Sequence, residues 1–250
     1  MQRLKLTYVF LFLCTFLSKS IHAQKLHFVA EALPPFHFMG ADNQPAGVLV
    51  DVVKAVLKQA NLNGDIKLLP FARCHDLTIK KSNTFMFSFL KTPTREAKFK
   101  WVGQIYKNKA FLIGLKNRND IHLQSLEDAK DWVVGTIRGY HSASYLLNSG
   151  FSTQNNLYLN VNYNQMWGML FKKRIDLILT NTIALETELK SIGLDSSLTK
   201  QYIELNDFPN ELYITSGLNT SDQKIKQLSL ALIEIKNNGT YQKIMSKWNM

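Results

Sequence analysis

Arg95 is the residue whose type and position point most directly to binding chemistry. It lies two residues after Pro93, which suits the first position of a helix, so we expect a helical turn over residues 93–98. A cation in the first turn opposes the helix dipole, and an anion docked beside it relieves that cost. Because a guanidinium group binds a carboxylate through two parallel hydrogen bonds, we expect Arg95 to hold a ligand carboxylate. The alternative is a surface ion pair with Glu96.

The segment from Gly139 to Ser142 is a second candidate for anion binding. It leads into a predicted helix over residues 142–148, and free backbone N–H groups at the start of a helix bind carboxylates. The alternative is a plain turn in which Ser142 caps the helix. Within this segment we expect Tyr140 to stack on the ligand and His141 to line the pocket as a polar group rather than as a catalyst.

Other aromatic and polar residues complete the set of candidates. We expect Phe36 to wall the pocket and Ser88, near the end of a predicted strand, to line it. Trp167 has the spacing of a core residue. Arg73 is either a second contact to an anion or an exposed residue of a helix, and the sequence favours neither.

The elements that must position these residues alternate between strand and helix, judged from the spacing of apolar residues and from stop signals. The expected strands cover residues 26–30, 66–69, 84–89, 111–115, 132–137, 157–159, 175–180 and 211–216. The main expected helices cover residues 49–60, 72–80, 142–148, 163–171, 182–190, 221–236 and 241–248. This alternation predicts an α/β fold with mostly parallel sheets covered by helices on both faces.

Two successive series of such elements predict two lobes. We expect residues 24–114 and 216–250 to form the first lobe and residues 115–215 to form the second, with short extended crossings near residues 113–119 and 211–219. Ligands of parallel α/β sheets bind beyond the carboxyl ends of the strands. The segments that fall there are 34–38, 88–95, 138–142 and 180–181, so the ligand cleft should lie between the lobes.

The first 23 residues have the layout of a secretory signal peptide. Arg3 and Lys5 precede an apolar run over residues 6–17, and Ala23 is a small residue at the expected cleavage point. The apolar run is shorter than the roughly 18–20 residues that span a bilayer. We therefore expect export to the periplasm and a processed chain that starts at Gln24.

The composition argues against several classes of function. The chain has 30 Lys and Arg against 19 Asp and Glu, a formal net charge of +11. The lysines are scattered, without a dense run, so we expect a solvated surface and no nucleic-acid partner. We also expect a monomer. Removal of the signal peptide leaves Cys74 as the one cysteine, which excludes an internal disulfide. The cysteine and histidine spacing resembles no zinc site, so no metal or cofactor is expected.

Several segments, in order and spacing, resemble the periplasmic solute-binding proteins of the polar amino acid ABC transporter type, bacterial extracellular solute-binding family 3. The resemblance runs from Leu26 to Trp248. It rests on residues 33–38 (LPPFHF), 47–52 (GVLVDV), 92–96 (TPTRE), 125–128 (SLED), 134–139 (VGTIRG), 174–177 (RIDL) and 239–244 (GTYQKI). It implies the two-lobed periplasmic-binding-protein type II fold, a carboxylate contact at Arg95 and delivery of the ligand to an ABC permease in the inner membrane.

Two positions depart from the pattern of that family. Asn181 falls where its amino acid binders usually carry an Asp for the ligand ammonium group, and Leu90 replaces a hydroxyl often found near the carboxylate. An amide cannot form an ion pair with an ammonium group. The resemblance therefore predicts a carboxylate-bearing ligand and weak binding of ordinary zwitterionic amino acids. The segment from Pro70 to Arg73 also resembles a divergent branch of the family.

The sequence thus favours a binding protein that is not an enzyme and that captures a small anionic or zwitterionic solute, an amino acid or derivative. One alternative is a dehydratase-like enzyme on the same fold, which needs a general acid or base in the cleft. Glu31, His37 and His141 are candidates for that role, but no pair of them is compelling. The other alternative is a soluble sensor that docks on a membrane receptor.

Overall fold

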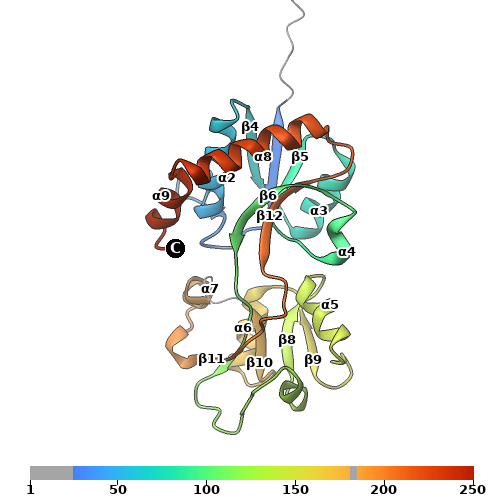
Figure 1. Ribbon diagram of the computed structural model, residues 1–250. Coiled ribbons are helices and arrows are strands. Elements are labelled where there is room, and N and C mark those ends of the chain that lie inside the picture. The colour runs from blue at the N-terminus through green and yellow to red at the C-terminus, as the bar shows by residue number, and fades with distance from the viewer. Residues whose placement is uncertain (1–24, 181–184) are drawn as a thin grey trace, which may run out of the picture.

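Two five-stranded sheets form the framework of the molecule, one in each lobe of Figure 1. The structure is a computed structural model that describes residues 25–180 and 185–250. In spatial order, the first sheet contains β4 (Gly64–Leu68), β1 (Leu26–Ala30), β5 (Thr84–Leu90), β12 (Glu211–Ser216) and β6 (Lys100–Lys107). The second contains β11 (Thr199–Glu204), β7 (Phe111–Leu115), β10 (Leu177–Thr180), β8 (Val134–Ile137) and β9 (Leu157–Asn160). This confirms the expected two-lobed α/β fold.

Each sheet has a parallel half and an antiparallel half. In the first sheet β1 runs parallel to β4 and β5, and β12 runs antiparallel to β5 and β6. In the second, β8 runs parallel to β9 and β10, and β7 runs antiparallel to β10 and β11. The parallel half supplies the strand ends at which a ligand cleft forms.

Of the four edge strands of the two five-stranded sheets, the sequence did not predict β6 and β11. In β6 the two fully buried residues are Val102 and Ile105, which are three positions apart, because bulges shift its pairing with β12. A bulge breaks the two-residue alternation by which a strand is recognised. β11 has no fully buried residue, so it shows no apolar pattern at all. A short antiparallel pair, β2 (Phe38–Met39) and β3 (Pro45–Ala46), was also not predicted.

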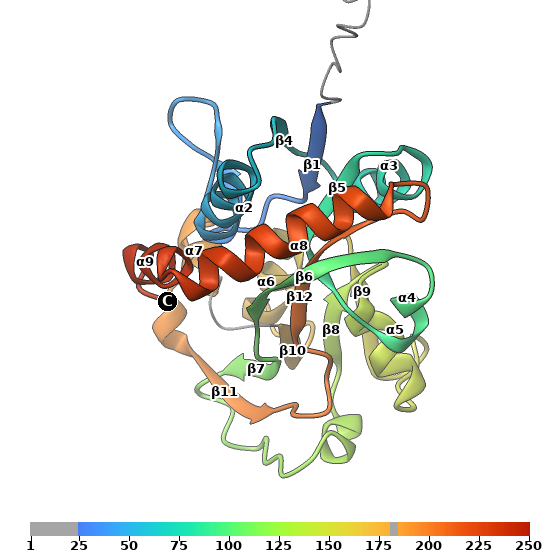
Figure 2. The same cartoon turned by 45° about the horizontal axis from the view of Figure 1, so that its top comes forward.

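Helices cover both faces of each sheet. In the first lobe, α2 (Val48–Gln59) and α8 (Asp222–Asn237) pack on one face with α9 (Thr240–Lys247), and α3 (Phe71–Lys80) packs on the other (Figure 2). Phe28 and Val29, adjacent in β1, belong to the core clusters on opposite faces. In the second lobe, α5 (His141–Asn148) and α6 (Tyr163–Phe171) contribute to separate core clusters, and α7 (Leu185–Ser191) packs with α6. Two 3₁₀ turns, η1 (Glu127–Asp131) and η2 (Ser196–Leu198), complete this lobe.

Cys74 lies inside the first lobe between α3 and the sheet. Its side chain is fully buried, and its thiol donates a hydrogen bond to the Leu69 carbonyl at 3.4 Å. Burial raises the pKa of this thiol to about 11. It is therefore a protonated core residue. None of the helices in the described parts of the chain is both long and apolar enough to cross a membrane.

The chain crosses between the lobes twice, and the two crossing segments are bonded to each other. The Asn108 N–H donates to the Asn210 carbonyl at 2.7 Å, and the Leu205 N–H donates to the Ala110 carbonyl at 2.8 Å. Both crossings lie earlier in the chain than residues 113–119 and 211–219, where the sequence placed them, because β7 pairs in the second sheet and β12 in the first. All five residues of β7 are buried, as are the last three of β12, and such burial suits the interior of either sheet.

Glu188 is a buried carboxyl group in the core of the second lobe. One of its oxygens accepts a hydrogen bond from the Trp167 indole N–H at 2.7 Å, and the other has no hydrogen-bond partner among residues 25–180 and 185–250. Burial raises the pKa of Glu188 to about 7, although the Trp167 bond acts in the opposite direction. The folded protein therefore holds this proton more tightly than the unfolded chain does.

This shift predicts a pH-dependent gain in stability from Glu188→Gln. A carboxyl group whose pKa rises on folding from about 4.3 to about 7 stabilises the native state below pH 4.3, and that contribution is lost as the pH rises through 7. The glutamine side chain does not titrate. The free energy of unfolding of the variant minus that of the wild type should therefore be about 2 kcal/mol larger at pH 8 than at pH 5. Urea unfolding at both pH values measures this. Glu186→Gln, an exposed position on the same helix, is the control, and an equal difference at both pH values would contradict the prediction.

Candidate functional site

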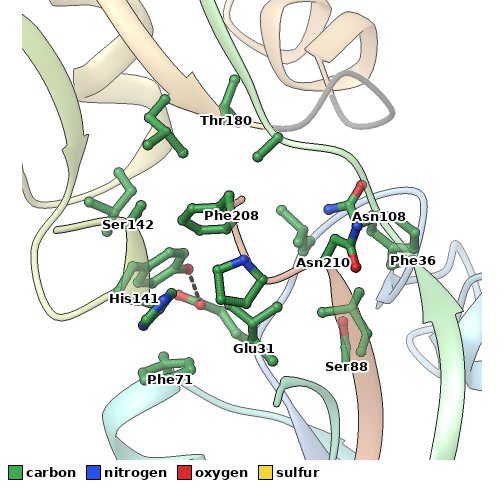
Figure 3. Close-up of a pocket in the computed structure, with 18 of the residues that line it drawn as sticks. Glu31, Phe36, Phe71, Ser88, Asn108, His141, Ser142, Thr180, Phe208 and Asn210 are labelled. Atoms are coloured by element: carbon green, nitrogen blue, oxygen red, sulfur yellow. Dashed lines mark hydrogen bonds between the residues drawn. The ribbon is translucent and has the colours of Figure 1, made fainter. Parts of the chain in front are cut away.

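A cavity of about 160 Å³ lies between the two lobes (Figure 3). Cavities of this size hold a small organic molecule. Its wall contains residues at or just after the carboxyl ends of strands in both sheets: Glu31 after β1, Ser88 and Leu90 in β5, Ile137 in β8, and Thr180 in β10. The crossing segments close the cavity with Asn108, Lys109, Ala110, Phe208, Pro209 and Asn210. The cavity is thus built from both lobes and from the connection between them.

Arg95 reaches the cavity from the short helix α4 (Pro93–Glu96). Its guanidinium group donates a hydrogen bond to the Leu90 carbonyl at 3.0 Å and lies 4.2 Å from the centre of the Phe89 ring. Burial lowers the pKa of Arg95, and no acidic group in the described parts of the chain offsets this effect. The alternative ion pair with Glu96 is not formed, because Glu96 pairs with Lys91 at 3.0 Å. Arg95 therefore keeps N–H groups for an anion in the cavity.

Ser88 lines the cavity from a distorted part of β5. Its φ angle is 60°, in the left-handed region that non-glycine residues rarely adopt. The pairing of β5 with β12 shifts here, between Tyr213 and Thr215. Such bulges turn a side chain out of the regular alternation, and backbone strain of this kind gathers at functional sites.

The second lobe presents the start of α5 to the cavity. His141 is the first residue of that helix, and its ring lies 5.5 Å from the ring of Phe208. Burial lowers the pKa of His141, and the positive charge of Arg95 lowers it further. Deeper in the wall, the hydroxyl oxygens of Thr136 and Ser142 are 2.5 Å apart. Arg95 and His141 thus bring positive or hydrogen-bond-donating groups to one region from opposite lobes.

Glu31 and Tyr140 join the lobes directly. The Tyr140 hydroxyl donates a hydrogen bond to the Glu31 carboxylate, drawn as the dashed line in Figure 3. The Phe71 ring lies 5.4 Å from the Tyr140 ring, which adds an aromatic contact across the cleft. Burial raises the pKa of Glu31, while the Tyr140 bond lowers it. The structure therefore shows a cleft whose walls are in contact.

The loop that carries Phe36 and His37 is fixed by the start of α2. The Leu49 N–H donates to the Phe36 carbonyl at 3.0 Å, and Gly47 has a φ angle of 124°. A Cβ atom at Gly47 would lie 2.4 Å from the Phe36 carbonyl oxygen, so only glycine fits this approach. Phe36 is fully buried and packs edge-on against Tyr106, with ring centres 5.2 Å apart. The α2 helix thus positions two residues of the cavity wall.

The structure brings most of the candidates from the sequence to this cavity. Those that line it are Phe36, Ser88, Arg95, Tyr140 and His141. Arg73 is exposed on α3 and does not line the cavity, so the structure gives it no place at this site. Asn181 lies outside the described residues. Trp167 is a core residue, as expected.

Sequence reasoning did not identify the crossing residues of the cavity, Asn108, Phe208 and Asn210. It named Glu31 only as a candidate for catalysis. Only the topology could have indicated these residues, because a ligand held between two lobes must contact the segments that connect them. Correct placement of the crossings would have found these residues. The described residues contain no group of three or more His, Cys, Asp or Glu side chains arranged to hold a metal ion.

Comparison with known proteins relates this architecture to one family. The model of the bacterial extracellular solute-binding proteins, family 3, matches residues 27–250. ABC transporter arginine-binding protein 1 of Escherichia coli (strain K12) is 26% identical over 230 residues, which cover 90% of this chain and 91% of that protein.

Solved structures share the fold. An ancestral arginine-binding protein bound to arginine superposes with a TM-score of 0.77 at 21% identity, over 91% of this chain and 99% of that chain. A histidine kinase sensor domain with similarity to periplasmic binding proteins superposes with a TM-score of 0.79 at 13% identity, over 90% of this chain and 96% of that chain. At these identities the likeness shows the fold alone.

Proposed function

Because the chain belongs to the bacterial extracellular solute-binding proteins, family 3, we propose that it captures a small carboxylate-bearing ligand between its lobes and delivers it to an ABC permease. The ligand class is an amino acid or a derivative of one. The observation that carries this proposal is the Arg95 guanidinium, which lines the interlobe cavity with no carboxylate partner among the described residues. The names of the Escherichia coli relatives, which describe arginine-binding proteins of ABC transporters, support the same class.

The geometry supports a clamp on the carboxylate from both lobes. Arg95 approaches from the first lobe, and the start of α5, with His141 at its first position, approaches from the second. A bidentate guanidinium contact fixes the orientation of a carboxylate, and helix N–H groups add donors without a further positive charge. An anion held by both lobes stabilises the closed arrangement relative to the open one, so that binding and closure are coupled. We include Phe36, Ser88 and Tyr140 in the site as its remaining walls.

We further propose that the protein acts in the periplasm as a monomer and releases its ligand unchanged. The basic, apolar and small residues of segment 1–23 support export. The family match and the transporter-associated relatives support binding rather than catalysis. The sensor-domain similarity concerns the fold and gives no separate support to a sensing role.

The Arg95 assignment predicts a selective loss of binding. A thermal-shift screen of amino acids, their derivatives and small acids identifies the ligand, since a ligand at 100 times its Kd adds about 2.7 kcal/mol of stability. Arg95→Ala should then weaken binding by about 2–5 kcal/mol in calorimetry without loss of folding, and Arg95→Lys should restore only part of it. Lys98→Ala, which removes an exposed cation outside the cavity, should leave the affinity unchanged. Wild-type affinity in Arg95→Ala would reject the assignment.

The export proposal predicts the mass of the mature protein. Protein recovered from the periplasm of a bacterial host should begin at Gln24, as read by intact-mass spectrometry. Leu11→Arg places a charge in the apolar run and should leave the chain unprocessed, because a charged residue interrupts the segment that signals export. Periplasmic protein that retains residues 1–23 would contradict the proposal.

The absence of catalysis is tested on the same ligand. After prolonged incubation with excess ligand, NMR spectroscopy should show the ligand unchanged, because a binding protein returns to its open form without chemistry. A product that accumulates with time and disappears in the Arg95→Ala variant would favour the enzyme alternative.

A further inference from the structure

One end of the cavity is apolar and is continuous with the core of the first lobe. In Figure 3, Phe36 lies on the side of the cavity opposite to His141. Five residues line the cavity and also belong to, or pack against, the core cluster that α2 and α8 form with the first sheet: Leu33, Phe36, Phe87, Leu90 and Leu212. We call these five residues, together with His37, the apolar end. A ligand group that enters this end contacts hydrocarbon on several sides.

His37 brings one polar side chain to the apolar end. It is 3% exposed, and neither ring nitrogen has a hydrogen-bond partner within residues 25–180 and 185–250. Its ring stands edge-on to the Phe87 ring, with centres 5.5 Å apart, and its centre lies 6.3 Å from that of the Phe36 ring. A neutral imidazole has one N–H donor and one acceptor nitrogen, and a buried polar atom without a partner is costly. His37 therefore keeps hydrogen-bonding capacity for a group that enters this end.

The apolar end carries no charge. Burial lowers the pKa of His37 to about 4, and the opposing effects come from main-chain groups of Glu31 and His37 rather than from a charged side chain. The imidazole is therefore neutral at pH 7. The Glu31 carboxylate accepts the hydrogen bond of Tyr140, and Lys109 is held by Glu204 at 3.0 Å. A ligand cation in the apolar end would lose its hydration without gaining a countercharge from the residues that form it.

The size of the cavity limits the apolar group to about one ring. A dry apolar cavity of about 150 Å³ binds benzene, and the present cavity of about 160 Å³ also includes Arg95 in its wall. The Arg95 guanidinium donates to the Leu90 carbonyl at 3.0 Å, and the Leu90 side chain is part of the apolar end. The carboxylate contact and the apolar end are therefore within reach of one small acid.

We propose that the apolar end binds an aromatic ring of the ligand and that His37 binds a hydroxyl group on that ring. The ligand class is then a hydroxyaryl carboxylic acid, either an amino acid or the corresponding acid without the amino group. The ring gains contact with leucine side chains and edge-on contact with the rings of Phe36 and Phe87. The hydroxyl group satisfies a His37 nitrogen that no described residue bonds. The proposal rests on the proposed function, since it assumes that Arg95 holds the carboxylate.

Calorimetry on the wild type at pH 7.5 tests the ligand class with two sets of probes. The first set is L-tyrosine, L-phenylalanine and L-arginine, and the second is the same three acids without the α-amino group. In at least one set, the hydroxyaryl member should bind at least about tenfold more tightly than the member without the hydroxyl group, because a site built around a hydrogen bond rejects a ligand that lacks it. It should exceed the guanidinium member by at least about tenfold too, because that charge has no partner at the apolar end.

Variants of His37 separate the hydrogen bond from the packing. His37→Phe keeps a ring against Phe87 but removes both nitrogens, so it should lose most of the preference for the hydroxyl group. His37→Gln keeps a neutral donor and acceptor and should retain part of that preference. His122→Phe makes the same change at an exposed position outside the cavity and should retain all of it. Circular dichroism and Tm of each variant establish folding.

The outcomes distinguish this subsite from the proposed function. The subsite is overturned by tightest binding of the guanidinium member in both sets, by equal affinity for the ring with and without its hydroxyl group, by a preference that His37→Phe keeps, or by a wild type that binds none of the probes. In these cases the proposed function stands if Arg95→Ala still weakens the carboxylate ligand from the thermal-shift screen. Equal binding of that ligand by Arg95→Ala and wild type overturns the proposed function instead.

Discussion

The hydrogen bonds between the two crossing segments are the constraint on which the cleft depends. Two sheets joined by a single segment would be free to twist independently. Here the Asn108 and Asn210 main chains are hydrogen-bonded, as are those of Ala110 and Leu205, so the two segments are held side by side. This pair of segments joins the two sheets at the cavity. It also contributes side chains to the cavity, so the connection between the lobes is part of the binding surface.

The electrostatics of the cavity follow from burial without internal neutralisation. Arg95 and Glu31 both lie in the cavity, yet neither forms an ion pair among the described residues. Removal of a charge from water is costly unless it is paired. An anion bound beside Arg95 would offset the cost there. At Glu31 the cost is reduced by the hydrogen bond from the Tyr140 hydroxyl, which comes from the opposite lobe.

The periodic spacing of apolar residues predicted the long helices and most strands well. The rule that ligands bind beyond the carboxyl ends of parallel strands predicted where most of the candidate residues that line the cavity lie. The helix from Val48 to Gln59 buries seven apolar residues on its packed side. The local sequence also predicted the helical turn that carries Arg95 after Pro93. The edge strands β6 and β11 and the two crossings were not predicted, because their pairing partners are distant in the chain and their own apolar patterns are irregular. The contact between Glu31 and Tyr140 joins residues 109 positions apart, and no local pattern contains that information.

The burial of Cys74 has a consequence for how the first lobe can be observed. Among the described residues it is the single free thiol, fully enclosed beside β1 and β5 and almost entirely protonated near neutral pH, with a pKa of about 11. A thiol-directed reagent reaches it only when the packing of α3 on the sheet opens. The rate of labelling then reports local unfolding of that layer and is insensitive to rigid motion of the lobes. Labelling of Cys74 would therefore distinguish local unfolding of the core of the first lobe from hinge motion between the lobes.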